Sequence, residues 1–312
     1  MDARSPTIDT SIADSWVVNG ADQLALRVYG WRSNTGGRSA LFWGHANGFA
    51  SGAYAPMLSE LAREFDIFAA DLRAHGGSAD PGGDYDRTIS ADRLAIDMIA
   101  VIKSVRERSP TQPLHFAAHS MSGLAGLRMG AVFGLSPFRS MTLFEPPLAP
   151  TPDIILHAGA ASLGHVLSGR ATKRKQILPS PPEFAAQLKE RPGFCNWRKD
   201  MLAAFAQATL SPRIDGNGWE LRCSAAAEAA GYRLTMDTST FAALARFDRP
   251  VVFVESDPAT QGPAPSWATK AQGVAAQQAP KGFLDRINGT SHMMPFENPD
   301  AVIGRIRKSI AG

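Results

Sequence analysis

Short apolar runs alternate along the chain with longer amphipathic segments. The apolar runs predict strands, and they cover residues 24–29, 40–43, 66–71, 114–118, 140–144, 251–254 and 283–287. Between and after them, apolar residues recur at helical spacing over residues 54–65, 90–106 and 301–310. Strands that alternate with helices in this way are typical of βαβ units, and they predict a mostly parallel sheet flanked by helices.

The alternation stops within residues 148–236 and then resumes. Prolines punctuate this region, and no buried strand pattern is visible in it. Three segments have helical spacing, namely residues 184–188, 200–210 and 225–230. We therefore predict a core built from residues 16–147 and 237–312, with residues 148–236 forming a helical cap inserted into it.

Composition narrows the class of protein. Charged residues make up 20% of the chain and the formal net charge is +3, too little to indicate a nucleic-acid partner. The basic run at residues 173–175 is typical of a solvated face. Only two cysteines, Cys195 and Cys223, occur, and they can build neither a disulfide framework nor a cysteine zinc site. No apolar run approaches the ~18 residues of a membrane span, and no signal peptide is visible. We expect a soluble, cytoplasmic protein.

A serine stands where a predicted strand turns into a predicted helix. The strand at residues 114–118 leads directly to Ser120, and an apolar helical run follows. A sharp turn of this kind pushes the serine Oγ out above the sheet, and it needs small residues two positions before and after the serine. Ala118 and Ser122 meet that requirement. Ser120 is therefore the candidate nucleophile.

A histidine near the end of the chain can act as its base. His292 lies in a glycine-containing loop between the last predicted strand and the last predicted helix. Neutral imidazole is the natural proton acceptor for a serine hydroxyl near pH 7. A lone loop histidine is more often structural, but the pairing with Ser120 favours the catalytic interpretation.

A glycine-containing loop after another strand offers backbone donors. In residues 43–49, small residues allow a tight fold that presents N–H groups. We predict an oxyanion hole formed by the backbone N–H groups of Asn47 and Met121. His45 is expected to hold this loop by hydrogen bonds. It shares no ligand spacing with the chain's other histidines, so no metal site is expected.

Four motifs in the right order resemble those of the α/β-hydrolase family. Residues 45–48 stand where the family carries an H-G-x-P oxyanion loop, and residues 118–123 resemble G-H-S-M-G-G. Residues 71–78 resemble D-x-R-G-H-G-x-S, with Ala74 in place of a glycine, and residues 289–299 resemble G-x-G-H-x-x-x-x-E-x-P. The resemblance covers about residues 16–147 and 237–312. It implies the α/β-hydrolase fold, a cap that closes over the active site and serine chemistry without a metal or organic cofactor.

The acid that would complete the triad has two candidates. The family usually places it after the strand before the last, where Asp257 stands, although only six residues separate this position from Pro250. Some members place it after the strand that follows the elbow helix, where Glu145 stands. Either carboxylate could orient His292 and stabilise its imidazolium. We prefer Asp257.

These residues predict a serine-dependent hydrolase that cleaves a carboxylic ester or related acyl bond of a small molecule through an acyl-enzyme. Lactone, thioester and C–C bond hydrolysis stay open. So do two other classes, a ligand-binding protein with a slow triad and a cofactor-free oxygenase or haloperoxidase-like enzyme. The cap is expected to shape an apolar pocket with Phe49, Met293 and Met294, favouring small to medium apolar acyl groups over charged ones. The sequence gives no oligomeric state.

Overall fold

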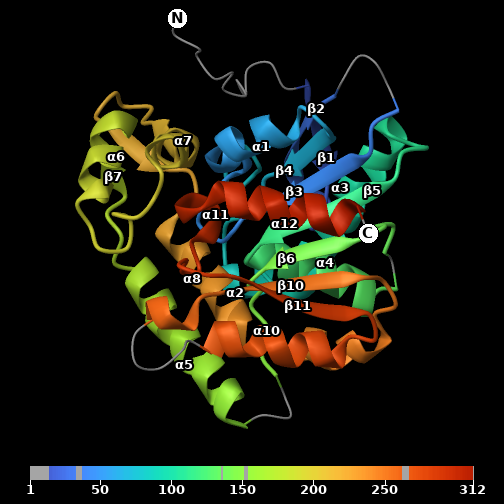
Figure 1. Cartoon of the computed structure of the whole chain (residues 1–312). Coiled ribbons are helices and arrows are strands. Elements are labelled where there is room, and N and C mark those ends of the chain that lie inside the picture. Colours follow the sequence, from blue (N-terminus) through green and yellow to red (C-terminus); the bar gives the residue numbers. More distant parts are fainter. Residues whose placement is uncertain (1–13, 33–36, 135, 151–153, 262–266, 312) are drawn as a thin grey trace, which may run out of the picture.

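An eight-stranded sheet in the order β1-β2-β4-β3-β5-β6-β10-β11 forms the core of this computed structural model (Figure 1). The structure describes residues 14–32, 37–134, 136–150, 154–261 and 267–311. β2 pairs antiparallel with β1 and β4, and the other neighbours are parallel. The mostly parallel sheet predicted from the sequence is confirmed. Its strands are β1 (Asp14–Asn19), β2 (Ala25–Trp31), β3 (Ala40–Gly44), β4 (Asp66–Ala70), β5 (Leu114–His119), β6 (Met141–Phe144), β10 (Val251–Ser256) and β11 (Gly282–Ile287).

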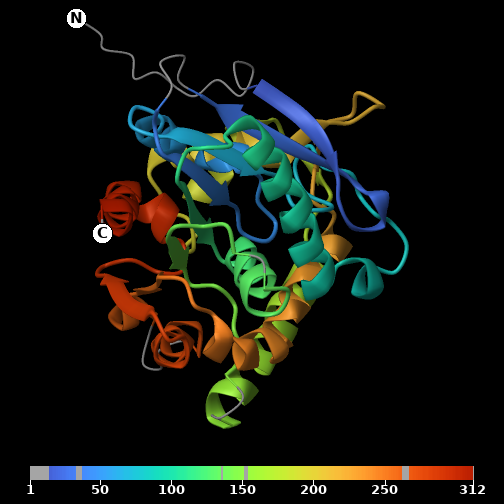
Figure 2. The same cartoon turned by 90° about the vertical axis from the view of Figure 1, so that its right-hand side faces the viewer.

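Helices cover both faces of the sheet because consecutive strand side chains point to opposite sides. In β3, Leu41 and Trp43 pack toward α1 and α12, whereas Phe42 packs toward α3 and α4. α12 and α3 accordingly lie on opposite sides of the sheet (Figure 2). The core helices are α1 (Ala55–Leu61), α2 (Tyr85–Thr88), α3 (Ala91–Arg108), α4 (Met121–Ala131), α9 (Ser239–Ala243), α10 (Trp267–Gln278), α11 (Met294–Glu297) and α12 (Pro299–Ala311).

Single helical turns connect these elements. They are η1 (Ala21–Gln23), η2 (Ser51–Tyr54), η3 (Leu234–Met236), η4 (Leu244–Arg246) and η5 (Pro258–Gln261). No helix in the described ranges is both long and apolar enough to cross a membrane.

The segment between β6 and η3 forms the structure that we call the cap. Its helices are α5 (Ile154–Ala171), α6 (Pro181–Lys189), α7 (Lys199–Thr209) and α8 (Ala225–Arg233). It also contains a small antiparallel sheet in the order β7-β9-β8, made of β7 (Ile177–Leu178), β8 (Leu210–Pro212) and β9 (Trp219–Leu221). The expectation of a purely helical cap was therefore incomplete, because strands of two or three residues leave no alternation in a sequence.

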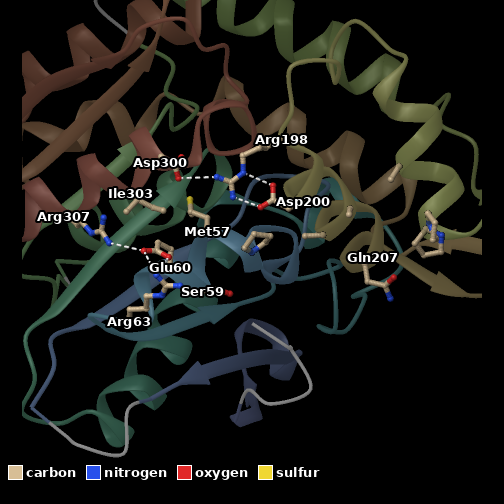
Figure 3. Close-up of a pocket in the computed structure, with 16 residues that line it drawn as sticks. Met57, Ser59, Glu60, Arg63, Arg198, Asp200, Gln207, Asp300, Ile303 and Arg307 are labelled. Carbon is tan, nitrogen blue, oxygen red and sulfur yellow. Dashed lines mark hydrogen bonds and ion pairs between the residues drawn. The ribbon is translucent and has the colours of Figure 1, made fainter. Parts of the chain in front are cut away.

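Ion pairs line a groove of about 830 Å³ where the cap meets the core (Figure 3). At the start of α7, Arg198 contacts Asp200 at 2.8 Å and Asp300 of α12 at 3.3 Å. Arg307 of α12 contacts Glu60 of α1 at 3.8 Å. The charges of these arginines and carboxylates thus compensate one another.

A buried ion pair ties the loop after β4 to α3. The Arg73 side chain is fully buried, and its Nε and Nη2 donate to the Asp97 carboxylate at 2.7 and 2.8 Å. Asp97 also accepts the Ala21 N–H at 2.8 Å. Burial raises the pKa of the Asp97 carboxyl even though Arg73 acts to lower it. The loop that carries Arg73 is the one that supports the functional site described below.

Replacing Asp97 with alanine should lower the free energy of unfolding by about 3–5 kcal/mol, because the buried Arg73 charge would lose its buried partner and keep only the more distant, exposed Asp22 at 3.6 Å. Chemical denaturation measures the loss. Asp14→Ala is the matched control, because Asp14 pairs with Arg32 at 3.3 Å on the surface, where such pairs contribute little. Equal effects of the two substitutions would contradict this account.

Candidate active site

Parallel strands bring the candidate residues to one edge of the sheet. Asn47 follows β3, Ser120 follows β5, Glu145 follows β6 and His292 follows β11. Because β3, β5, β6, β10 and β11 are neighbours that run in the same direction, their carboxyl ends meet beside the cap (Figure 1). Residues far apart in the sequence therefore share one site.

Ser120 occupies a strained turn between β5 and α4. Its φ of 56° and ψ of −119° lie in a region that non-glycine residues rarely adopt and that concentrates at functional sites. A Cβ placed on Gly44 would lie 2.3 Å from Ser122 Cβ. Only glycine at position 44 lets the end of β3 approach the start of α4, which is the close packing that the sequence predicts for an elbow.

The carboxylate that contacts His292 is that of Glu145. His292 Nδ1 donates to Glu145 Oε2 at 2.7 Å, and Glu145 Oε1 accepts the N–H and the hydroxyl of Ser256 at 2.8 and 2.6 Å. The Glu145 side chain is fully buried. Burial acts to raise its pKa, but the hydrogen bonds from His292 and Ser256 outweigh burial and hold the pKa below its ordinary value. Glu145 is thus ionised at neutral pH.

The preference for Asp257 as the partner of His292 was wrong. The Asp257 carboxylate accepts backbone N–H groups of Ala259 and Gly289 at 2.9 and 2.8 Å, and these bonds lower its pKa. It fastens the end of β10 to the loop before His292. Asp257 lies away from His292 because β10 is longer than β6. Phe144, the last residue of β6, pairs with Val254, and β10 continues for two more residues before Asp257.

A chain of hydrogen bonds joins the loops that carry the site. The Ala46 N–H donates to Tyr54 Oη at 3.2 Å, and Tyr54 Oη contacts His119 Nδ1 at 2.8 Å. His119 Nε2 lies 2.9 Å from the His292 carbonyl. A carbonyl only accepts, so His119 donates from Nε2 and Tyr54 donates to Nδ1. Burial lowers the pKa of His119 well below its ordinary value, which keeps this tautomer neutral.

The described structure contains no hydrogen bond between the Ser120 hydroxyl and His292. Such contacts are often long before a substrate binds. The two residues are nevertheless coupled, because His119 precedes Ser120 and its ring lies 4.9 Å from the His292 ring, centroid to centroid. Near the sheet edge, 35% of the His292 side chain is exposed.

Two buried histidines hold the loop after β3. The Leu72 N–H donates to His45 Nε2, and the Gly48 N–H donates to His75 Nε2, both at 2.9 Å. Burial and the nearby His45 lower the pKa of His75 to about 3, so that its ring stays a neutral acceptor. His45 has the structural place that the sequence indicates.

The loop positions the predicted oxyanion donors and also touches the cap. Within the described ranges, neither the Asn47 N–H nor the Met121 N–H donates to an acceptor of the chain, so both can serve a ligand. The Asn47 side chain donates to the Glu228 carbonyl of α8 at 2.8 Å. Gly231, one turn further along α8, approaches Asn47 so closely that a Cβ would lie 2.3 Å from Asn47 Oδ1.

A cavity of about 980 Å³ lies between the cap and this edge. Phe49, Ser291 and Met293 line it, whereas Ser120 and His292 are not among its lining residues. Met294 does not line it either, because its side chain is fully buried in the hydrophobic core. α11 begins at Met294. The start of this helix places the Met293 side chain at the cavity and the Met294 side chain in the core.

Sequence reasoning missed several residues of the site. Tyr54 and Ser256 complete the hydrogen bonds to His119 and Glu145, and neither belongs to a motif that marks it. Glu228 borders the cavity from a cap helix whose sequence is unremarkable for a site. Among the described residues, no group of three or more histidine, cysteine or acidic side chains could hold a metal ion.

A strained serine, a carboxylate-bound histidine and free backbone N–H groups at one edge of a parallel sheet are features of a hydrolase built on an α/β fold. The chain belongs to the alpha/beta hydrolase family, whose model matches residues 35–305. No curated protein sequence matches it significantly.

Solved structures of similar fold include several hydrolases. E-2-(acetamidomethylene)succinate hydrolase is 20% identical with a TM-score of 0.75, covering 96% of this chain and all of its own. The enol-lactonase of Burkholderia xenovorans is 15% identical with a TM-score of 0.62, over 95% of this chain and 100% of its own. A thioesterase domain from the curacin biosynthetic pathway is 18% identical with a TM-score of 0.65, over 95% and 99%.

If Glu145 orients His292, Glu145→Gln should lower kcat for an activated ester by up to about 10⁴-fold, because the histidine tautomer would no longer be held. Asp257→Asn is the matched control and should have a mild effect, since the hydrogen bonds of the Asp257 carboxylate within the described residues come from backbone N–H groups and not from His292. Steady-state kinetics of both variants show which of the two carboxylates orients His292. A crippling effect of Asp257→Asn with a mild effect of Glu145→Gln would restore the rejected assignment.

If the Tyr54 hydroxyl positions the His292 loop, Tyr54→Phe should lower kcat more than it changes KM. It should also cost about 1–3 kcal/mol of stability, because the Ala46 N–H and His119 Nδ1 lose their shared partner. Tyr85→Phe removes a hydroxyl that donates to exposed Asp80 at 2.8 Å and accepts a long hydrogen bond from Ser224 at 3.4 Å. It does not contact the His292 loop, so kcat should not change and the loss of stability should be smaller than in Tyr54→Phe. A loss of stability in Tyr54→Phe with an unchanged kcat would reduce Tyr54 to a packing residue.

Proposed function

We propose that the protein is a serine hydrolase that cleaves a carboxylic ester, or a related lactone or thioester, through an acyl-enzyme. The observation that carries the proposal is the hydrogen bond of His292 Nδ1 to buried Glu145, at the sheet edge where Ser120 occupies a strained turn. With Nδ1 donating, neutral His292 presents Nε2 as an acceptor, and within the described residues this atom accepts no hydrogen bond.

The mechanism follows from these positions. His292 Nε2 takes the proton of Ser120 as its Oγ attacks the substrate carbonyl, and Glu145 stabilises the imidazolium that forms. The N–H groups of Asn47 and Met121 stabilise the negative charge on the carbonyl oxygen. The protonated His292 then gives its proton to the leaving alcohol or thiol. Water activated by His292 finally releases the acid and restores Ser120.

The names of the structural neighbours support this proposal, and the free cysteines support a cytoplasmic location, which we also propose. Cys195 is exposed and Cys223 buried, and both are free thiols, as is usual in the reducing cytoplasm that we propose. The neighbours named above carry the names of hydrolases, including a lactonase and a thioesterase. We also propose that residues 148–236 act as one cap that shapes substrate choice.

Ser120→Ala should fold normally and lose about 10⁴- to 10⁶-fold in kcat, the scale of triad knockouts. The assay is release of p-nitrophenol from esters of increasing chain length. Ser122→Ala is the neighbouring control for covalent labelling: a fluorophosphonate probe should label Ser120 in this variant and in the wild type, but not in Ser120→Ala. Mass spectrometry locates the adduct.

Labelling elsewhere, or wild-type turnover by Ser120→Ala, would refute the assignment. Saturable ester binding without turnover in the wild type would instead favour a ligand-binding protein with a slow triad. Oxygen consumption or halide oxidation without ester cleavage would favour the oxygenase or haloperoxidase-like alternative.

A further inference from the structure

The cavity beside His292 carries an excess of positive charge that the proposed mechanism does not use. Its lining includes five basic side chains and one acidic side chain, which are Arg170, Lys173, Arg174, Lys175, Arg191 and Glu228. The basic residues come from the end of α5, from the loop that follows it and from the turn after α6. Cap elements separated in the sequence thus contribute the same charge.

The one acidic side chain of the lining, Glu228, already has partners within the protein. Glu228 is buried and forms an ion pair with Arg174. The Tyr232 hydroxyl donates to Glu228 Oε1 at 3.3 Å. Glu228 also lies against Gly48, where an added Cβ would come within 2.8 Å of its Oε1. This carboxylate therefore neutralises Arg174 and leaves the other four cations uncompensated.

The four remaining cations, Arg170, Lys173, Lys175 and Arg191, are exposed at the cavity. Within the described ranges none of them forms an ion pair. The groove in Figure 3 shows the contrast, because its arginines face carboxylates such as Glu60, Asp200 and Asp300. A wall that carries one sign of charge attracts and orients ligands of the opposite sign.

The rest of the cavity is apolar and reaches the catalytic loops. Phe184, Leu188 and Trp197 are buried at its wall. Phe49 adjoins the predicted oxyanion loop, and Met293 follows His292 directly. The cavity thus joins an apolar wall beside the site to a basic rim at solvent, and its volume of about 980 Å³ is enough for a small-molecule ligand.

We propose that this cavity binds a substrate that carries an anionic group, a carboxylate or a phosphate, separated by an apolar segment from the acyl bond that is cleaved. The inference rests on the proposed function and names its substrate class. Guanidinium groups bind carboxylate and phosphate oxygens through paired N–H donors, which Arg170 and Arg191 can supply. The sequence-based expectation of a preference for uncharged acyl groups is replaced by this one.

The test compares two substrates that differ only at the far end of the acyl chain. Monoethyl adipate carries a carboxylate where ethyl hexanoate carries a methyl group, and a pH-stat measures the acid released from each. At low salt, kcat/KM should be at least about tenfold higher for monoethyl adipate. The preference should shrink as salt is added, because salt screens charges at an exposed rim.

The double variant Arg170→Gln/Arg191→Gln should bring the ratio of the two kcat/KM values close to 1. Lys199→Gln is the matched control, since Lys199 is an exposed cation of the cap that does not line the cavity, and it should keep the wild-type ratio. An equal kcat/KM for both esters in the wild type, together with no preference in the thioester comparison described next, would overturn the proposal. So would a preference that is unchanged in the double variant.

A second comparison distinguishes the two sources of negative charge. Butyryl-coenzyme A carries phosphates on the leaving group, whereas the butyryl thioester of N-acetylcysteamine lacks them. A salt-sensitive preference for the coenzyme A thioester that the double variant loses assigns the basic rim to a phosphate. A preference confined to monoethyl adipate assigns it to an acyl-chain carboxylate.

Failure of the proposed function gives a different result. If the wild type hydrolyses none of these substrates, calorimetric titration with adipate and with coenzyme A tests the site directly. Salt-sensitive binding that is lost in Arg170→Gln/Arg191→Gln and kept in Lys199→Gln supports the anion site even when hydrolysis fails. Absence of binding of both adipate and coenzyme A to the wild type overturns it.

Discussion

The hydrogen bond between Glu145 and His292 is the interaction on which the geometry of the site depends. A fully buried carboxylate is tolerated only when its charge is compensated, and His292 and Ser256 together provide that compensation. Because Glu145 must contact both His292 and Ser256, the end of β6 has a fixed position relative to β10 and β11. The loop after β11 then holds His292 beside His119 at the end of β5, next to Ser120, which we propose as the nucleophile.

Much of this arrangement could be predicted because it is local. The alternation of apolar runs and amphipathic helices marks the core strands, and small residues around Ser120 mark the elbow. Residues after parallel strands must gather at one edge, so Ser120 and His292 could be placed together from the sequence. β1 is the exception among the core strands, since its apolar run, Trp16–Val18, is only three residues long and no strand was expected there.

The remaining features depend on contacts that no local pattern contains. Asp257 and Glu145 both follow strands, and only the two extra residues of β10 direct Asp257 to the backbone of Gly289 instead of to His292. The basic run at residues 173–175 is typical of a solvated surface, yet Arg174 forms an ion pair with Glu228 of a distant helix. Met293 and Met294 are chemically alike, and only the start of α11 separates one at the cavity from one in the core.

The contact between Asn47 and α8 has a consequence for how the enclosure over the site can open. The Asn47 side chain holds the Glu228 carbonyl, and Gly231 allows the two segments to touch. Moving the whole cap outward would break this buried hydrogen bond and displace the loop whose N–H groups we propose as oxyanion donors. This contact therefore opposes movement of α8 away from the loop. An opening that left it intact would have to form beside α5 and α6, where several side chains that line the cavity are exposed.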